Sequence, residues 1–239
     1  MFYAQKDELA KFVGIETKNY DFDMQIKFSD LKECIHKLNE DKSVHAILFR
    51  SVSKTISLRD AINLISPEKD VAGVTTLNQG RLFLGEPGMI PCVPLAVLHL
   101  LRSVHEKIEG MHSVVLGRSS SVGRPMTQLL LNANCTVTSL HSYSKNIINV
   151  CRTADILVSA IGNPHFITKD FVKIGATVID VGINPVVDEK GIPKIVGDVD
   201  FEDVETVAGA VTPVPNGVAP MTASYLMHNT LKLACCAQV

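Results

Sequence analysis

The chain has 239 residues, of which 46% are hydrophobic and 20% are charged, and its formal net charge is −2. This length and composition predict a folded chain with a buried core, arranged as one large or two small domains. The near-balanced charge argues against a nucleic-acid partner, and the lack of long basic or apolar runs argues against a membrane surface or a membrane span.

The cysteines and histidines give no sign of a metal site. Six cysteines contain no C-x-x-C pair, and the eight histidines are scattered without metal-ligand spacing, so we expect no metal and no disulfide framework. The first residues lack the apolar region of a secretion signal. We therefore expect a reducing compartment, the cytoplasm, with a mitochondrial location left open if the N-terminus is truncated.

The first part of the chain predicts helices and one buried strand. Apolar residues at helical spacing predict helices over 5–13, 29–39 (capped by Ser29) and 58–65, and the apolar run at 46–49 predicts a strand. The glycine-containing segment 70–84 is expected to be irregular. The apolar run at 94–104 predicts a central helix that links the two halves.

From residue 113 onward, strands alternate with helices or loops. The predicted strands cover 114–116, 136–140, 156–160, 177–181 and 208–211, and a final helix covers 221–234. This alternation is typical of a parallel sheet in an α/β fold.

The run from Ser113 to Met126 predicts a strand, a turn and the start of a helix. Gly117 can turn sharply because it has no Cβ, and Gly123 lets the helix lie close to the sheet. Unpaired N–H groups at the helix start would face outward and attract a pyrophosphate. Because the spacing of the glycines departs from G-x-G-x-x-G, a plain connection without a ligand remains the alternative.

The end of the next strand indicates which nucleotide would bind. His141 and Ser142 stand where an acidic residue would bind a ribose 2′-hydroxyl. Together with Arg118 from the preceding turn, they suit a 2′-phosphate better. The sequence therefore favours NADP over NAD as the cofactor.

Four ordered motifs resemble those of one family. The segments 117–125, 181–184, 196–201 and 212–222 are similar to signatures of the bifunctional methylenetetrahydrofolate dehydrogenase/methenyltetrahydrofolate cyclohydrolase family. The resemblance implies a Rossmann-like parallel-sheet domain over 93–220 that binds NAD(P). It also implies a smaller, N-terminally shortened α/β folate domain over 1–92, onto which a last helix at 221–235 packs back, and a homodimer formed through the nucleotide domains.

The resemblance also implies which residues bind the cofactor and the folate substrate. The implied cofactor-binding residues are Gly117, Arg118, Ser119, Val122, Gly123, His141, Ser142, Gly162, Ile183 and Thr212. The implied substrate-binding positions are Phe2, Arg50, Ala72, Pro215 and Gly217, and the implied catalytic residue is Lys6.

Three folate-site positions depart from the family pattern. Phe2 replaces the tyrosine one helical turn before Lys6, Arg50 replaces a glutamine that supports the lysine, and Ala72 replaces a pterin-binding aspartate. A partly dry site would lower the pKa of Lys6, and Arg50 would either lower it further or bind the glutamate tail of a folate. The alternative is that Lys6 is an ordinary solvated lysine.

Other expectations concern the backbone and the remaining polar groups. The family carries a helix and a strand before the lysine helix, so either the chain is a fragment or its first sheet is short by a strand. An exposed edge beside 46–49 would follow unless a partner covers it. Asn216, in place of a glycine, is expected to tolerate positive φ. Cys92 is expected to be a buried structural thiol, Asp180 a turn cap and Asp198 an ordinary loop carboxylate, the last two without a catalytic role.

Three functional hypotheses follow. The first is an NADP-dependent methylenetetrahydrofolate dehydrogenase in which hydrolysis of the methenyl product is the weaker activity. The second is a nucleotide-binding pseudoenzyme, for example a regulatory dimer partner, because the folate positions are altered. The third is another NADP oxidoreductase, whose acidic substrate is held by Arg50 and Lys6.

Overall fold

The computed structural model describes residues 4–23, 25–50, 56–187 and 191–236. The chain divides into two compact units: Met1–Cys92 together with Ala223–Val239, and Val93–Thr222. Within the described ranges, no helix combines the length and the apolar character that a membrane span requires.

A parallel sheet forms the centre of the unit Val93–Thr222. Among the described residues it has five strands in the order β2-β1-β3-β4-β7. The strands are β1 (His112–Leu116), β2 (Thr136–Leu140), β3 (Ile156–Ser159), β4 (Thr177–Asp180) and β7 (Ala210–Val211). Each pair of neighbouring strands is parallel. The five predicted strands and their parallel arrangement are confirmed, with boundaries that differ by two residues at most.

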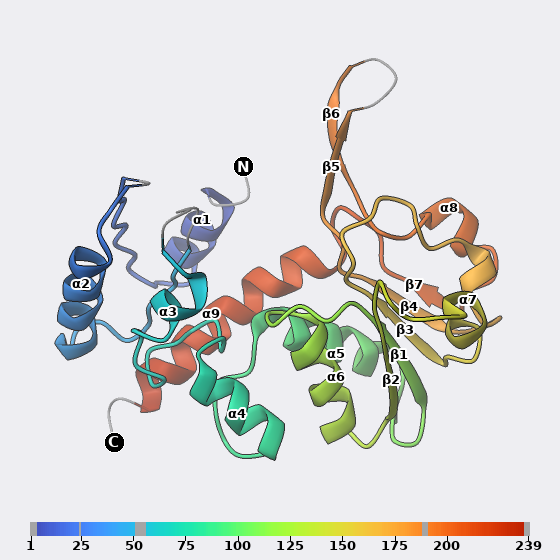
Figure 1. Cartoon of the computed structure of the whole chain (residues 1–239), viewed down its shortest axis with the longest axis horizontal. Helices are drawn as coiled ribbons and strands as arrows, with labels where there is room; N and C mark the ends of the chain where they lie inside the picture. The colour runs from blue at the N-terminus through green and yellow to red at the C-terminus, as the bar shows by residue number, and fades with distance from the viewer. Residues whose placement is uncertain (1–3, 24, 51–55, 188–190, 237–239) are drawn as a thin grey trace. The chain divides into compact units, whose positions relative to one another are not determined.

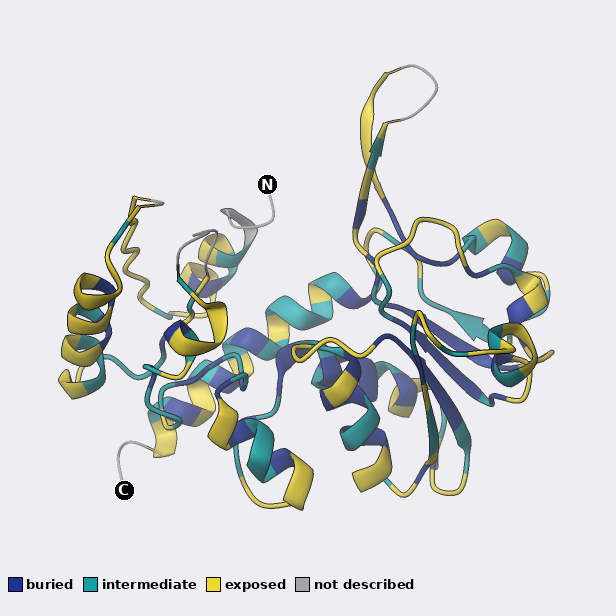
Figure 2. Ribbon diagram, viewed as in Figure 1, coloured by how far each residue is buried: buried dark blue, intermediate teal, exposed yellow. Residues whose placement is uncertain are grey.

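Helices cover both faces of this sheet (Figure 1). One side carries α5 (Cys92–Val104) and α6 (Gly123–Asn132), and the other carries α7 (Ile147–Cys151) and α8 (Phe201–Val204). Successive strand residues point to opposite faces. Val114 and Leu157 therefore pack with Cys151 of α7, whereas the equally buried Val115 and Val158 point to the other face. Figure 2 shows the central strands as buried, because both faces are covered.

A two-stranded hairpin was not predicted. β5 (Asn184–Val187) and β6 (Pro193–Val196) pair antiparallel with each other and extend away from the five-stranded sheet (Figure 1). The two runs are short and both contain proline, which weakens a strand signal. Gly191 could have indicated the turn of the hairpin, because it lies between two apolar runs, and in the structure it has φ +78°.

The other unit is largely helical. Its helices are α1 (Ala4–Phe12), α2 (Phe28–Glu40), α3 (Leu58–Ile62), α4 (Thr76–Leu84) and the main part of α9 (Val218–Cys236). The predicted helices over 5–13, 29–39, 58–65 and 221–234 are confirmed, although α3 ends three residues early. Their apolar stripes form a core that includes Leu31, Ile35 and Ala61.

Two predictions about helices in this unit are wrong. Ser29 does not cap α2, because the helix already begins at Phe28 and the Ser29 hydroxyl donates to Asp30 Oδ1 at 2.9 Å. Part of the segment expected to be irregular forms α4. Thr75 caps α4 by accepting from Asn78 N at 3.4 Å, and Gly85 ends it with φ +73°. These interactions at the two ends of α4 offset the loss of helix stability caused by Gly80 inside it.

The predicted strand at 46–49 is also wrong. Only Ile47 of this segment forms a bridge, which is parallel to Asp70. Because there is no strand at 46–49, the exposed strand edge expected beside it is absent from this segment as well. The apolar side chains explain the error, since Ile47 and Phe49 do pack against Leu31 and Ile35. An apolar run of four residues predicts burial more securely than it predicts a hydrogen-bonded ladder.

Candidate nucleotide and lysine sites

The carboxyl ends of the parallel strands bring several candidate residues to one edge of the sheet. Gly117 N donates to Leu140 O, Ala160 N to Leu116 O and Val181 N to Ser159 O, each at 2.8 Å. The loops that carry Gly117, His141, Gly162 and Ile183 therefore start side by side. In open α/β sheets, ligands bind outside this edge.

Two glycines allow a close contact between the turn after β1 and its surroundings. Gly117 has φ +114°, and a Cβ on it would collide with the carbonyl oxygen of Ala160. A Cβ on Gly123 would lie 2.7 Å from Arg118 N and closer still to Gly117. Gly123 was predicted to let α6 lie close to the sheet. A close contact is present, but its nearest atoms belong to the turn after β1 and not to a strand.

The N–H groups at the start of α6 are not all unpaired, contrary to the prediction. Ser119 Oγ accepts from Val122 N and from Gly123 N, both at 3.2 Å, and Ser119 O accepts from Arg124 N at 3.0 Å. Serine side chains often pair with nearby backbone in this way. Ser119 therefore shapes the turn, and its hydroxyl still has a hydrogen that it can donate.

Arg118 and the loop after β2 form a cationic and aromatic surface. The guanidinium carbon of Arg118 lies 5.7 Å from the ring centroid of Tyr143, within cation–π range. Tyr143 N donates to His141 Nδ1 at 3.2 Å, so in a neutral imidazole the proton is on Nε2. Arg118 reaches this loop as predicted. Tyr143, which is 80% exposed, was missed, although it directly follows Ser142.

The prediction that Asp198 is an ordinary loop carboxylate is wrong. Asp198 is completely buried, and its two oxygens accept five hydrogen bonds. Oδ2 accepts from Ser159 Oγ (3.1 Å), Ile161 N (2.8 Å) and Gly162 N (3.3 Å), and Oδ1 accepts from Asn163 N (3.0 Å) and Asn184 Nδ2 (2.9 Å). A carboxylate satisfied to this degree fixes the backbone around it.

Asp180 is a buried carboxylate beside Asp198. The expected turn cap is present, since Asp180 Oδ1 accepts from Gly182 N at 2.8 Å, and the carboxylate also accepts from Asp198 N at 3.0 Å and Val199 N at 2.9 Å. Burial raises the pKa of Asp180 from 3.8 to about 6, outweighing the three N–H bonds, which lower it. Thr212, a candidate nucleotide residue, accepts from Asp180 N through its hydroxyl at 2.8 Å.

Lys6 lies on α1 in the other unit and is half-buried. Its burial lowers the pKa of the ammonium group, the Arg50 guanidinium lowers it further, and the Cys92 thiol acts in the opposite direction. The predicted lowering and the contribution of Arg50 are both confirmed, which argues against a fully solvated lysine. Phe2 lies outside the described residues.

Cys92 is a buried structural thiol, as expected. Burial raises its pKa to about 11, so the thiol stays protonated and is a poor nucleophile at neutral pH. Asn229 of α9 donates through Nδ2 to Cys92 Sγ (3.4 Å), Val71 O (3.1 Å) and Ile90 O (3.1 Å). A single asparagine in an apolar helix gave no sequence signal for this role.

Ala72 lies two residues after a buried carboxylate. Asp70 is 1% exposed, and its Oδ2 accepts from Thr75 N at 2.8 Å and from Asn78 Nδ2 at 3.0 Å. Its Oδ1 has no hydrogen-bond partner in the part of the chain that the structure describes. The segment therefore contains a carboxylate at position 70, two residues before the position where the family pattern has an aspartate.

Pro215 and Gly217 follow β7 in a tightly packed loop. The Val214–Pro215 peptide bond is cis, and Asn216 has φ +77°, which confirms that asparagine tolerates this position. A Cβ on Gly217 would collide with Pro213 O and would lie 3.0 Å from Thr212 Cβ. Local packing alone thus requires a glycine at position 217.

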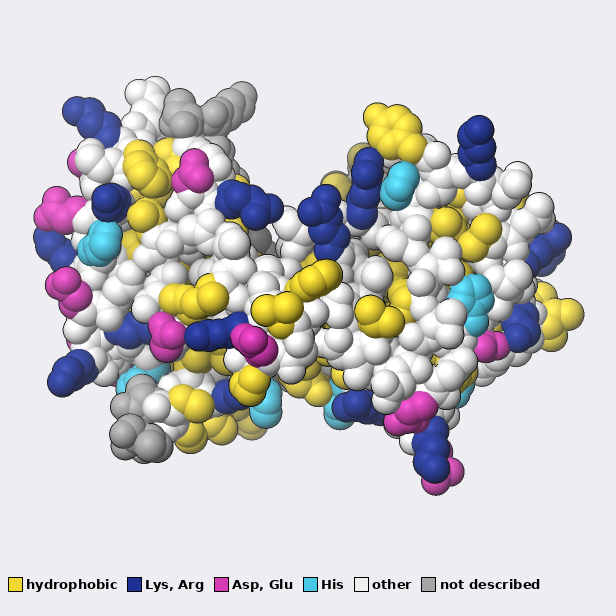
Figure 3. All heavy atoms as spheres, turned by 60° about the horizontal axis from the view of Figure 1, so that its bottom comes forward, with side chains coloured by type: hydrophobic (Ala, Val, Ile, Leu, Met, Phe, Trp, Pro, Cys, Tyr) yellow, Lys and Arg dark blue, Asp and Glu magenta, His cyan; other side chains and the backbone are white. Residues whose placement is uncertain are grey.

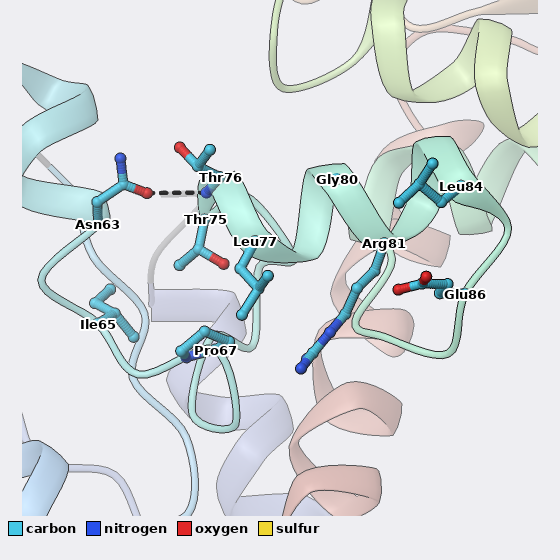
Figure 4. Close-up of a pocket in the computed structure, with 10 residues that line it drawn as sticks. All are labelled: Asn63, Ile65, Pro67, Thr75, Thr76, Leu77, Gly80, Arg81, Leu84 and Glu86. Carbon is cyan, nitrogen blue, oxygen red and sulfur yellow. Dashed lines mark hydrogen bonds between the residues drawn. The ribbon is translucent and has the colours of Figure 1, made fainter.

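Two surface cavities lie within single units. One of about 450 Å³ lies beside α4, where Asn63 accepts from Thr76 N (Figure 4), and its lining includes no candidate residue. The other, about 540 Å³, is lined by Ser144, Asn146, Ile147, Ile148, Asn149, Phe166 and Phe171 and adjoins the loop after β2. Among the residues described, no group of three or more His, Cys, Asp or Glu side chains could hold a metal ion.

The fold and the loop geometry are those of an α/β nucleotide-binding domain joined to a second unit. Residues 91–238 match the tetrahydrofolate dehydrogenase/cyclohydrolase NAD(P)-binding domain, and residues 1–72 match the catalytic domain of the same family. The chain belongs to the tetrahydrofolate dehydrogenase/cyclohydrolase family.

Individual relatives are similar over nearly the whole chain. The bifunctional protein FolD of a Wolbachia strain is 46% identical over 237 residues, which cover 98% of this chain and 80% of that protein. The crystal structure of the Campylobacter jejuni bifunctional enzyme FolD matches with a TM-score of 0.93 at 39% identity, covering 98% of this chain and 82% of that one. The Trypanosoma brucei enzyme, complexed with NADP cofactor and inhibitor, has a TM-score of 0.93 at 34% identity, covering 99% of this chain and 82% of that one.

The raised pKa of Asp180 predicts a specific pH dependence of stability. The folded protein keeps a proton on Asp180 up to about pH 6, whereas the unfolded chain loses it near its ordinary pKa of 3.8. Stability due to this group is therefore lost as the pH rises between these values. The free energy of unfolding of wild type, measured by urea denaturation relative to Asp180→Asn, should fall by about 2 kcal/mol between pH 4 and pH 7.

Asp155→Asn is the matched control. Its hydrogen bond with Lys173, followed by the bond from His112 N, lowers the pKa of Asp155, so its contribution is complete above the unfolded pKa. The difference between wild type and this variant should be constant above about pH 5. A constant difference for Asp180→Asn as well would show that Asp180 is ionised throughout.

Proposed function

We propose that this protein is an NADP-dependent 5,10-methylenetetrahydrofolate dehydrogenase of one-carbon metabolism, with methenyltetrahydrofolate cyclohydrolase as its second activity. The observation that carries the proposal is the presence of both the catalytic and the NAD(P)-binding regions of one family in this chain. Family membership favours this hypothesis over an unrelated oxidoreductase. The reading as a pseudoenzyme rests on three altered positions, Phe2, Arg50 and Ala72.

The residues at the sheet edge fit an NADP molecule. Gly117 and Gly123 let the turn after β1 pack tightly against Ala160 and the start of α6, where a Cβ would collide, and this turn lies at the edge where a pyrophosphate would bind. The exposed Arg118, with His141 and Ser142, suits the 2′-phosphate, and no carboxylate directly follows β2 to repel it. When bound, NADP would accept a hydride from the methylene bridge of the folate.

The remaining cofactor candidates are proposed as contacts of the same site. These are Ser119, Val122, Gly162, Ile183 and Thr212. Ile183 is 54% exposed, which suits an apolar contact with a ligand ring. Because Ser119 and Thr212 already accept backbone hydrogen bonds, their contribution includes holding the loops in shape.

Lys6 is the proposed proton acceptor for hydrolysis of the methenyl bridge. A lowered pKa increases the neutral fraction of its amine, and a neutral amine can take a proton from attacking water. Arg50 increases this fraction further. In the same unit, Ala72 replaces a pterin carboxylate implied by the family pattern, which should weaken folate binding by about 1–3 kcal/mol. We propose Phe2, Pro215 and Gly217 as further folate contacts.

We also propose a homodimer that uses the β5–β6 hairpin. Val187, Ile192 and Ile195 of the hairpin are 67%, 57% and 43% exposed. In the described part of the chain β5 and β6 pair only with each other, and an isolated two-stranded hairpin is marginally stable. A second copy related by two-fold symmetry would cover these apolar side chains and the strand edges.

The surface and the thiols support the proposed substrate and compartment. Lys and Arg side chains occur together with Asp and Glu side chains on the face shown in Figure 3, which suits a small-molecule substrate better than a nucleic acid or a charged membrane. All six cysteines are free, in keeping with a reducing compartment such as the cytoplasm.

Arg118→Ala should abolish the preference for NADP. Removal of the guanidinium deprives the 2′-phosphate of a charge-assisted contact, so NADP binding should weaken about tenfold or more while NAD binding changes little. Calorimetric titration with each nucleotide measures both constants. Arg152→Ala, which removes a guanidinium paired with Asp170, is the control. An unchanged preference in Arg118→Ala, or tighter NAD binding by wild type, would contradict the proposal.

Arg50→Gln should move the pH dependence of hydrolysis upward. Without the guanidinium, the pKa of Lys6 rises, so the rate reaches half its maximum at a higher pH. Decay of methenyltetrahydrofolate, followed against pH, measures the shift. Lys6→Ala should lower hydrolysis by about 10²-fold or more, while the dehydrogenase, which depends on positioning, should be less affected.

Lys11→Ala is the control on the same helix, because Lys11 is exposed. It should leave both rates near those of wild type. Robust hydrolysis in Lys6→Ala would show that another group activates the water.

Ile195→Lys should dissociate the proposed homodimer. A charge buried in an apolar interface is costly, so sedimentation should show a monomer at concentrations where wild type is dimeric. Ile174→Lys, at an 84% exposed position in the same unit, should leave the dimer intact. A wild-type protein that is monomeric would contradict the proposed homodimer. A dimer that persists in Ile195→Lys would show that the hairpin does not form the interface.

A further inference from the structure

We propose that Asp198 is a positioning residue of the nucleotide site, which sets the shape of the loop 161–163 after β3. The proposal rests on the function proposed above and assigns a role in it to a residue that touches no ligand. Three consecutive N–H groups of this loop, those of Ile161, Gly162 and Asn163, donate to its carboxylate at 2.8, 3.3 and 3.0 Å. The loop backbone therefore surrounds the carboxylate of Asp198.

This arrangement needs acceptor oxygens on both sides of the side chain. Four of the five donors are N–H groups, which cannot accept a hydrogen bond. An asparagine at position 198 would turn its NH₂ group either toward Ile161 and Gly162 or toward Asn163. In both orientations at least one loop N–H would face another donor and lose its partner.

The loop presents its other side to solvent at the edge where the nucleotide is proposed to bind. Gly162 and Asn163 are exposed although Asp198 is buried. Gly162 has φ +68°, a conformation that glycine adopts without strain. Ala160, directly before the loop, lies against Gly117 so closely that a Cβ on Gly117 would collide with its carbonyl oxygen. A change in the loop would therefore reach the turn that carries Arg118.

Asp180 holds Asp198 itself in place. The Asp180 carboxylate accepts from the N–H groups of Asp198 and Val199 at 3.0 and 2.9 Å. The two carboxylates also occupy the space where a Cβ on Gly182 or Gly197 would lie. Gly182 and Gly197 therefore make room for two carboxylates that together connect the ends of β3, β4 and β6.

The test compares Asp198→Asn with Val204→Ala, a core variant of α8. Val204 is fully buried in the same unit and lies outside the loop, so its truncation lowers stability without altering the carboxylate. For each protein, thermal unfolding gives the stability, NADP titration gives the dissociation constant, and dehydrogenase kinetics give kcat and the KM for NADP. Asp198→Asn should weaken NADP binding about tenfold and raise the KM more than it lowers kcat. Val204→Ala should leave NADP affinity unchanged at a similar loss of stability.

A double variant tests the direction of the hydrogen bonds. In Asp198→Asn with Asn184→Asp, the new NH₂ group can donate to the carboxylate at position 184, so that the remaining oxygen can still accept from Ile161 and Gly162. This exchange should recover part of the lost NADP affinity. Asn184→Ala removes only one of the five bonds and should weaken binding about threefold. It provides the measurement if Asp198→Asn does not fold.

The outcomes separate the two proposals. A wild-type protein that binds no NADP would overturn the proposed function before any variant is compared. If wild type binds NADP but Asp198→Asn and Val204→Ala reduce its affinity equally, Asp198 has only a structural role and the inference is wrong. It is also wrong if Asp198→Asn folds and binds NADP as wild type does, or if Asp198→Asn is unfolded and Asn184→Ala binds normally.

Discussion

The nucleotide unit depends on the need to pair backbone N–H groups where five parallel strands end together. Each strand leaves the sheet at the same edge, and the N–H groups beyond it lose their ladder partners. Ser119 accepts two of them after β1, and Asp198 accepts three after β3. Where a ligand is proposed to bind, these loop N–H groups are therefore already paired with side chains of the protein itself.

The same constraint explains which parts of this unit could be predicted from sequence. Apolar runs such as 114–116 and 156–160 predicted strands because a sheet covered on both faces requires continuous apolar residues. Gly123 predicted a close approach at the start of α6, and its neighbour, Gly117, lies only six residues earlier in the chain. The burial of Asp198 could not be predicted, because its partners come from segments up to 39 residues away. The pairing of Ser119 with the start of α6 was missed because the helix dipole was considered without the competing serine hydroxyl.

The helical unit shows a different limit of sequence reasoning. Its helices followed from apolar periodicity, but α4 was missed, since Gly80 obscured a segment that Thr75 and Gly85 delimit. The lowered pKa of Lys6 was predicted correctly, because burial and a neighbouring cation act in the same direction. Asn229 was not foreseen, since its three acceptors come from residues 71–92, more than 130 positions away. Arg50, at a position where the family pattern has a glutamine, adds a positive charge that lowers the pKa of Lys6.

The contact between Arg118 and Tyr143 has a consequence for the thermodynamics of binding. A free arginine side chain samples many rotamers, and ordering it on a ligand costs about 2 kcal/mol of conformational entropy. Here the guanidinium already lies over an aromatic ring, so part of that ordering takes place when the protein folds. A phosphate that binds to this arginine meets a preorganised cation, and the entropic penalty of association is correspondingly smaller.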